Sequence, residues 1–139
     1  MKIKVIDFGY TNLPYRAHEN DAGADVYVCF HDVSSVTLAP HQTIKIPLGL
    51  GLNLPDGYAA YVFPRSGLAS KGIVCELPPI DSGYKGEIHA IVTNCGDNPF
   101  TIMNGDRIGQ LLITPVVIAQ FITDDIKERG TAGFGSTGK

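Results

Sequence analysis

Residues 43–54 read TIKIPLGLGLNL, residues 55–57 read PDG and residues 58–63 read YAAYVF. In the first segment an aliphatic residue stands at every second position, which is the period of a β-strand. The third segment is rich in the aromatic and β-branched residues that strands favour. PDG contains the residue types of a tight turn, so we predict that it joins two strands as a hairpin. This unit of strand, turn and strand indicates a β-sheet protein.

Short runs of the same kind recur along the chain between Pro, Gly, Asn and Asp, and helical periodicity is nearly absent. They predict an all-β domain built as a sandwich or barrel. A second turn, GDNP at residues 96–99, is predicted to join another pair of strands. One short helix is predicted to begin at Ser66, which caps it, and to end at Gly72. The other predicted strands are residues 3–7, 24–30, 73–75, 87–94, 100–103 and 107–114, with a further one at 117–122.

Composition limits the class of protein. A chain of 139 residues with 44% hydrophobic content suits one domain with its own core. The net charge of -3, with acids and bases interspersed, disfavours DNA or RNA as a partner. Cys29, Cys75 and Cys95 show no paired metal-ligand spacing, so we expect reduced, buried thiols. No apolar run has the length of a signal peptide or a membrane span, so we expect a soluble, cytoplasmic protein.

Residues 80–88, IDSGYKGEI, place one acid and one tyrosine on a turn that contains two glycines. Gly83 and Gly86 permit the positive backbone angles with which a turn could hold Asp81 and Tyr84 against a ligand. The stretch therefore resembles an active-site hairpin. Taken alone, Asp-Ser-Gly-Tyr is also an ordinary turn sequence.

The last ten residues, GTAGFGSTGK, carry four glycines and little apolar surface. Residues 133–139 match the opening of a P-loop, but neither the strand before it nor the helix after it is predicted. The segment still has the parts of a phosphate grip, namely freed backbone N–H groups, the Ser136 and Thr137 hydroxyls and Arg129 just upstream. Phe134 could stack on a nucleobase. The alternative is a mobile terminus without function.

Five segments together resemble the trimeric deoxyuridine triphosphatases (dUTPases), in the order and at the separations of that family. The resemblance covers nearly the whole chain and implies the all-β fold of the family, a β-barrel or jelly roll (β-clip) with one short helix. It assigns residues 1–128 to the barrel and residues 129–139 to a flexible glycine-rich lid. The segments are AGADV (22–26), PRSGLA (64–69), IDSGYKGEI (80–88), GDRIGQL (105–111), and RG (129–130) with GFGSTG (133–138).

The resemblance implies hydrolysis of dUTP to dUMP and pyrophosphate, which limits uracil in DNA and supplies dUMP for thymidylate synthesis. Asp81 would activate the water that attacks the α-phosphorus. Tyr84 would exclude ribose by packing against C2′ of the sugar. Mg²⁺ would be held mainly by the triphosphate. The family is homotrimeric with sites shared between subunits, so the isolated chain would be inactive.

The remaining site residues are also implied by the resemblance. Asp25 would support Mg²⁺ through water or orient an arginine. Asp106 and Arg107 are interpreted as a turn acid and a strand-leading base, and the four histidines as surface or strand residues. The triphosphate would be bound by Arg65, Ser66, Gly67 and Gln110, the base by the hairpin that contains Ile80, and the closed lid would add Arg129, Phe134, Gly135, Ser136 and Thr137.

One segment departs from the family pattern. Residues 75–79 read CELPP, where many relatives have glycine close before the Ile-Asp pair. In the family this hairpin reads uracil with backbone N–H and C=O groups, and proline has no N–H. The departure therefore bears on base selectivity more than on hydrolysis.

Two alternatives from other classes remain. A deaminase of the dCTP type, on the related fold, would need a general-base glutamate at the pyrimidine ring, for which Glu76 and Glu87 are the nearby candidates. A non-catalytic nucleotide sensor would bind dUTP and present its closed lid to a protein partner. The presence of Asp81, Arg65 and Arg129 argues against lost chemistry.

Overall fold

Ten short strands and one helix make up residues 1–125, the part of the chain that the computed structural model describes. Helix α1 (Ser66–Ala69) lies between the sixth and seventh strands. The strands are β1 (Lys4–Asp7), β2 (Ala24–Tyr27), β3 (Ser35–Leu38), β4 (Thr43–Pro47), β5 (Leu50–Asn53), β6 (Tyr58–Pro64), β7 (Ile73–Glu76), β8 (His89–Asn94), β9 (Phe100–Met103) and β10 (Arg107–Pro115).

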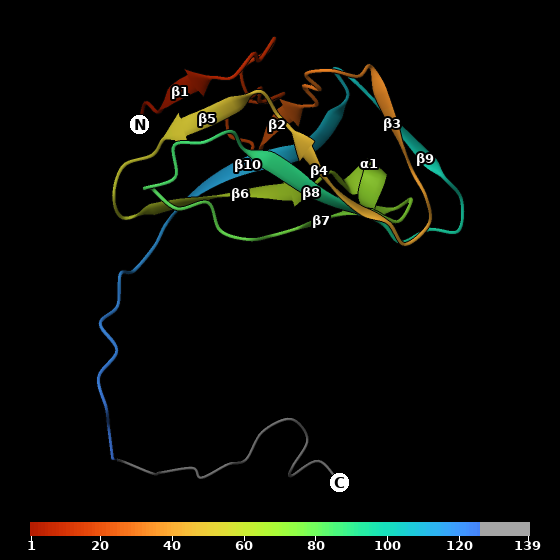
Figure 1. The fold of residues 1–139 in the computed structure, drawn as a ribbon. Coiled ribbons are helices and arrows are strands. Elements are labelled where there is room, and N and C mark those ends of the chain that lie inside the picture. Colours follow the sequence, from red (N-terminus) through yellow and green to blue (C-terminus); the bar gives the residue numbers. More distant parts are fainter. Residues whose placement is uncertain (126–139) are drawn as a thin grey trace, which may run out of the picture.

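Antiparallel pairing joins these strands into four small sheets, ordered β1–β5, β2–β10–β6, β3–β9 and β4–β8–β7. Every pair except β7–β8 joins strands that are not neighbours in sequence. Figure 1 shows β1–β5 and β3–β9 at opposite ends of the domain, and residues 116–125 leading away from it after β10. The predicted all-β barrel or jelly-roll class is confirmed.

The two predicted hairpins are wrong, although both turns exist. Strands β5 and β6 flank the turn at Asp56–Gly57, yet β5 pairs with β1 and β6 with β10. The turn at residues 96–99 likewise connects β8 and β9, which lie in different sheets. It is held by the buried side chain of Asn94, which accepts from Gly96 N at 3.0 Å and donates to Asn98 O at 2.8 Å. Alternation in a sequence marks a strand but does not identify its partner.

The predicted strand at residues 43–54 is divided in two at Gly49. Ile88 bonds with Leu48 on one side and Leu50 on the other, while Gly49 turns out of the ladder with φ +73°. A Cβ atom at Gly49 would stand 2.6 Å from Cys29 Sγ, so only glycine fits this position without displacement. The Gly49 carbonyl accepts from two backbone N–H groups of the β1–β2 connection. A tertiary contact thus divides a segment that is continuous by pattern.

Other predicted boundaries also change. Strand β3 is absent from the prediction, and β2 ends at Tyr27 instead of residue 30. Ser66 is not the helix cap, because Arg65 occupies the N-cap position and makes no side-chain cap bond. Residues 117–122 form no strand, since no other strand within residues 1–125 pairs with them. Their apolar side chains are exposed, Val117 by 91% and Phe121 by 94%.

The core contains inward-facing aliphatic side chains from all four sheets. Cys29 and Cys75 are half-buried, whereas Cys95 is exposed, which contradicts its predicted burial. All three thiols are free. Burial, with Glu76 beside it, raises the pKa of Cys75 to about 11, so this thiol stays protonated near neutral pH. Nothing helical in residues 1–125 has the length and apolar character needed to cross a membrane.

Candidate active site

The connection between β7 and β8 carries Asp81 and is fixed to β6 at its start. Ile80 forms an antiparallel bridge with Ala60, with backbone hydrogen bonds of 2.8 and 3.0 Å. The turn that follows is closed by Tyr84 N, which donates to the Asp81 carbonyl at 3.1 Å. The Asp81 carboxylate is exposed and makes no hydrogen bond or ion pair with any residue in 1–125. It is therefore available to accept a hydrogen bond from water.

Tyr84 is held by its own loop. Its ring packs on Gly86, where a Cβ atom would stand 2.6 Å from the Tyr84 hydroxyl. That hydroxyl donates to the Glu87 carbonyl at 2.8 Å. On the other side of the turn, Lys85 Nζ donates to the Ser82 carbonyl at 2.8 Å and to an oxygen of the β5 side chain Asn53 at 2.9 Å. The turn has a fixed shape although it is exposed.

A pocket of about 280 Å³ opens beside this turn, near the lower end of the size range for small-molecule sites. A larger hollow of about 470 Å³ lies among β1, β2 and β10 and contains none of the predicted site residues. The pocket beside the turn is lined by Lys45, Pro78, Pro79, Ile80, Asp81, Tyr84, Ile88, His89 and Ile91.

The backbone N–H and C=O groups of His89 point toward this pocket. Ile88 directs both its N–H and its C=O toward the β4–β5 segment, so alternation along β8 directs those of His89 to the opposite side. Strand β7 has ended there, because its last paired residue, Glu76, stands opposite Ile91. Pro78, which would stand opposite His89 if β7 continued in the same register, has no N–H to offer. One donor and one acceptor of the backbone are therefore left for a ligand.

A second group of predicted site residues gathers on the β2–β10–β6 sheet. Pairing places Asp25 of β2 opposite Gln110 of β10. The Asp25 carboxylate, with 16% of its side chain exposed, lies 3.8 Å from Arg65 Nε and 3.4 Å from Arg107 Nη1. Arg65 Nη1 also donates to the Arg107 carbonyl at 3.2 Å. Gly23 makes space for Gln110, whose Oε1 would be 2.6 Å from a Cβ atom there. One carboxylate thus orients two guanidinium groups.

Arg107 is the site residue that sequence reasoning missed. It does begin β10, as predicted, and Asp106 accepts from Met103 N at 2.9 Å as a turn acid. The Arg107 guanidinium also lies 5.9 Å from the centroid of the Tyr27 ring, within cation–π range. The sequence signal for Arg107 was its place in the GDRIGQL segment. That segment does not indicate that the partner of Arg107 is Asp25, which lies 82 positions away. A hollow of about 190 Å³ opens beside Arg65 and Arg107.

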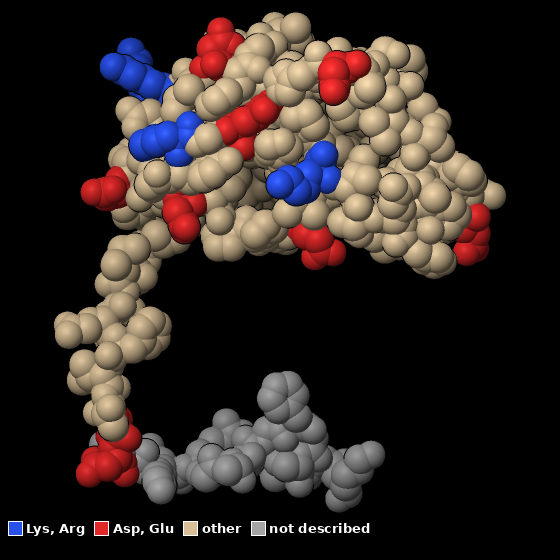
Figure 2. Space-filling model, viewed as in Figure 1, with Lys and Arg blue, Asp and Glu red and all other residues tan. Residues whose placement is uncertain are grey.

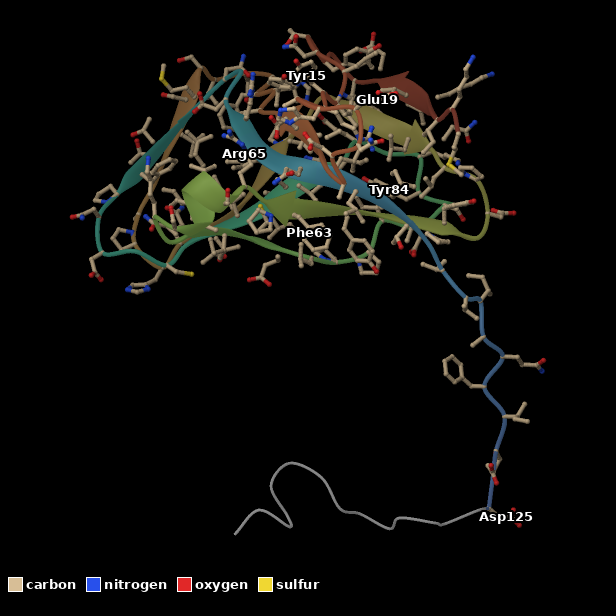
Figure 3. The ribbon with its side chains drawn as sticks, turned by 180° about the vertical axis from the view of Figure 1, so that it is seen from behind. Tyr15, Glu19, Phe63, Arg65, Tyr84 and Asp125 are labelled. Atoms are coloured by element: carbon tan, nitrogen blue, oxygen red, sulfur yellow. The ribbon has the colours of Figure 1, made fainter. Side chains whose placement is uncertain are left out.

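The two groups do not meet within one chain. Ile80 is anchored at Ala60 of β6. Arg65 directly follows the last residue of β6 and lies five residues after Ala60. At about 3.3 Å per residue, the two anchor points are roughly 16 Å apart. Figure 3 shows Arg65 beside α1 and Tyr84 farther along, toward the C-terminal end of β10. Ser66 and Gly67, exposed at the start of α1, belong to the Arg65 side.

The predicted lid residues Arg129, Phe134, Gly135, Ser136 and Thr137 lie outside the described residues, as does the predicted boundary between residues 128 and 129. Within the described part, no group of three or more His, Cys, Asp and Glu side chains could hold a metal ion. Figure 2 shows acidic and basic side chains interspersed over one face, without a continuous basic surface.

A protein-family model described as dUTPase matches residues 10–138. The deoxyuridine 5'-triphosphate nucleotidohydrolase of Leifsonia xyli subsp. xyli (strain CTCB07) is 46% identical over 133 residues, covering 91% of this chain and 85% of the relative. That of Ehrlichia canis (strain Jake) is 43% identical over 146 residues, covering 98% and 94%. The solved structure of Staphylococcus bacteriophage 80alpha dUTPase with dUPNHPP has a TM-score of 0.84 at 26% identity and covers 99% of both chains.

A dUTPase from phage phi11 of S. aureus shares the fold, with a TM-score of 0.82 at 23% identity over 93% of this chain and 100% of its own. Its structure reveals the coordination of a structural Mg(II) ion. The family match spans both groups of charged residues and the segment after β10. These findings place the chain among all-β nucleotide hydrolases. It belongs to the dUTPase family.

Proposed function

We propose that Asp81 is the general base with which this member of the dUTPase family hydrolyses dUTP to dUMP and pyrophosphate. The observation that carries the proposal is the exposed carboxylate of Asp81, which has no partner within residues 1–125 and lines a pocket that also contains Tyr84. Asp81 takes a proton from water as the water oxygen bonds to the α-phosphorus. The bond from the α-phosphorus to the bridging oxygen breaks in line, and pyrophosphate leaves.

The pocket beside Asp81 takes the deoxyuridine. The Tyr84 ring packs against C2′ of the sugar, so that a ribose hydroxyl meets an apolar surface and loses its hydration. The N–H and C=O groups of His89 supply a donor and an acceptor for the uracil edge, while Ile80 contributes apolar contact. Cytosine presents an acceptor where uracil presents its ring N–H, so the acceptor at His89 disfavours it. Pro78 supports this arrangement, because it cannot extend β7 over His89.

The group of residues around Arg65, on the β2–β10–β6 sheet and at the start of α1, binds the triphosphate. Arg65, Gln110 and the Ser66 hydroxyl offset charge on the transferring and leaving groups, and Gly67 permits close approach. Asp25 orients the Arg65 guanidinium, together with that of Arg107. The lid residues Arg129, Gly135, Ser136 and Thr137 close over the β- and γ-phosphates, with Phe134 over the uracil, and exclude bulk water.

The residues on the Arg65 side fit a magnesium ion that is held mainly by the substrate. Asp25 is a single carboxylate already facing two guanidinium groups, so it reaches a metal at most through water. Mg²⁺ retains several waters and needs few protein ligands. When bound, the ion offsets negative charge on the triphosphate.

We infer further that the active unit is a homotrimer whose sites are shared between subunits. The distance of roughly 16 Å along β6 between the two groups supports this inference. So does the apolar segment after β10, whose side chains are left uncovered by the rest of residues 1–125. Val117, Ile118, Phe121 and Ile122 are exposed by 91%, 81%, 94% and 80%. A neighbouring subunit would cover them.

Mixing two inactive variants tests the sharing of sites. Asp81→Asn and Arg65→Ala are each expected to be inactive, but a trimer reassembled from both should regain activity. If Asp81 and Arg65 of one site come from different chains, random assortment restores about a quarter of the sites. If they come from the same chain, no restored site can form. A mixture without activity would therefore exclude a site shared in this way.

The geometry gives little support to the deaminase. Neither Glu76 nor Glu87 lines the pocket beside Asp81. The Glu87 carboxylate faces Gly49 and His31 instead. The described lining of this pocket thus contains no glutamate that could act as general base at the pyrimidine ring.

The deciding experiment is pyrophosphate release with Mg²⁺ from dUTP, dCTP, dTTP and UTP, measured in parallel for the wild type and Asp81→Asn. We expect release from dUTP alone, and a loss of kcat of about 10²–10⁴-fold in the variant with dUTP binding retained. Loss of binding in Asp81→Asn would make Asp81 a structural turn residue. Tight binding of dUTP by the wild type without turnover would favour the sensor.

A further inference from the structure

Tyr84 is held by Glu87, and Glu87 is held from outside its own loop. The Glu87 side chain is 16% exposed. Its Oε2 accepts from Gly49 N at 2.8 Å and lies 2.8 Å from His31 Nε2, and its Oε1 lies 3.0 Å from the same nitrogen. A carboxylate only accepts hydrogen bonds, so His31 Nε2 carries the proton that joins them. The Glu87 backbone carbonyl accepts the Tyr84 hydroxyl.

The bend at Gly49 explains why a carboxylate stands here. Ile88 uses its own N–H and C=O on Leu50 and Leu48, which leaves the Gly49 N–H turned out of the ladder. In the part of the chain described, Glu87 is the acceptor for that N–H. The Glu87 side chain thus replaces the missing backbone partner of Gly49. It ties residues 86–88, the return arm of the loop, to the residue that precedes β5.

Close backbone packing makes the return arm a single unit with β5. A Cβ atom at Gly51 of β5 would stand 2.6 Å from the Gly86 carbonyl, and one at Gly86 would stand 2.6 Å from the Tyr84 hydroxyl. The Tyr84 ring, the peptide of Gly86 and strand β5 are therefore stacked without space between them. Glu87 is thus joined to the ring by the hydrogen bond at its carbonyl and by the close contact at Gly86.

We propose that Glu87 is a positioning residue for Tyr84 and thereby sets the preference for deoxyribose over ribose nucleotides. The inference rests on the proposed role of Tyr84 against the sugar. Glu87 does not line the pocket and acts only through the tyrosine. His31 supports the carboxylate from a half-exposed position, with 48% of its side chain accessible.

The test is the ratio of kcat/KM for UTP to kcat/KM for dUTP. Glu87→Ala should raise the ratio at least about tenfold, because a carbonyl at residue 87 that is no longer fixed through its side chain lets the ring move away from the ribose hydroxyl. Glu87→Gln retains one acceptor for Gly49 N and should restore most of the selectivity. Glu76→Gln, an exposed glutamate at the end of β7, is the matched control and should leave the ratio unchanged. Should Glu87→Ala fail to fold, His31→Ala takes its place, with a smaller rise expected.

Two variants of Tyr84 separate this inference from the proposed function. If the wild type uses UTP as well as dUTP, or Tyr84→Ala leaves the ratio unchanged, the sugar role of Tyr84 fails, and the inference with it. If Tyr84→Ala relaxes the ratio but neither Tyr84→Phe nor the Glu87 and His31 variants do, the inference alone is wrong. If it is right, Tyr84→Phe combined with Glu87→Ala is no more relaxed than the more relaxed of the two single variants, because both act through the same contact between the Tyr84 hydroxyl and the Glu87 carbonyl.

Discussion

A single methyl group at Gly49 should destabilise the domain strongly. Gly49 has φ +73°, and a Cβ atom there would stand 2.6 Å from Cys29 Sγ and 2.9 Å from Tyr10 N. The left-handed conformation costs a residue with a Cβ atom roughly 1–2 kcal/mol. Forcing a methyl group into a filled site adds roughly 1–3 kcal/mol. Gly49→Ala should therefore lower the free energy of unfolding by roughly 2–5 kcal/mol.

Gly57→Ala is the matched control. Gly57 has φ +84°, but a Cβ atom there would meet nothing within 4 Å, so this variant carries the backbone cost alone. Thermal and denaturant unfolding of both variants should be compared at one protein concentration, because association into the proposed trimer would contribute to Tm. We expect a Tm several degrees lower for Gly49→Ala than for Gly57→Ala. Equal losses would show that the contact with Cys29 and Tyr10 has no energetic effect and would refute the reasoning.

Three further predictions concern the site and the thiols. Asp25→Asn should lower kcat/KM for dUTP about 10–100-fold without changing Tm by more than a few degrees, because both guanidinium groups lose their orienting charge; an unchanged kcat/KM would remove Asp25 from the site. Deletion of residues 130–139 should cut kcat about 100-fold or more and leave Tm unchanged, and full turnover by the shortened chain would disprove the lid. At pH 8, Cys75, with its pKa raised from 9.0 to about 11, should react with a thiol reagent about 100-fold more slowly than an unshifted thiol of the same accessibility. The rate at which Cys75 reacts should still rise between pH 9 and 11. Mass spectrometry of labelled peptides can follow this rate, with the exposed Cys95 as the internal comparison. A plateau below pH 10 would contradict the raised pKa.

The sequence predicted strands correctly where apolar residues recur at every second position. It failed where a contact between residues far apart in sequence decides a bend or a strand pairing. The alternation in residues 43–54 indicated extended chain, and extended chain is found on both sides of Gly49. The bend itself depends on the loop that supplies Glu87, 38 positions away. The turn at Asp56–Gly57 was likewise predictable from its residue types. That its flanking strands belong to different sheets was not, because pairing depends on which apolar faces meet in the core.

The candidate site shows the same division. The order of the five segments pointed to Asp81, Tyr84 and Arg65 as single residues, because each segment is local in sequence. The partners that orient them are remote, since Asp25 reaches Arg107 over 82 positions and Glu87 reaches His31 over 56. A histidine without a neighbouring motif gives no signal of such a contact. Sequence therefore points to the proposed reacting groups more readily than to the groups that lie beside them in the fold.

The separation of the two groups along β6 has a mechanical consequence. Residues 58–64 of β6 pair without interruption with residues 109–115 of β10, so bending β6 would break a ladder of seven residue pairs. Ile80 and Arg65 are attached to this same stiff strand, and no loop movement within one chain brings their anchor points together. Under the proposed trimer, the carboxylate and the guanidinium that act on one α-phosphorus must come from different chains. Hydrolysis then depends on assembly, because within one chain the two anchor points stay roughly 16 Å apart.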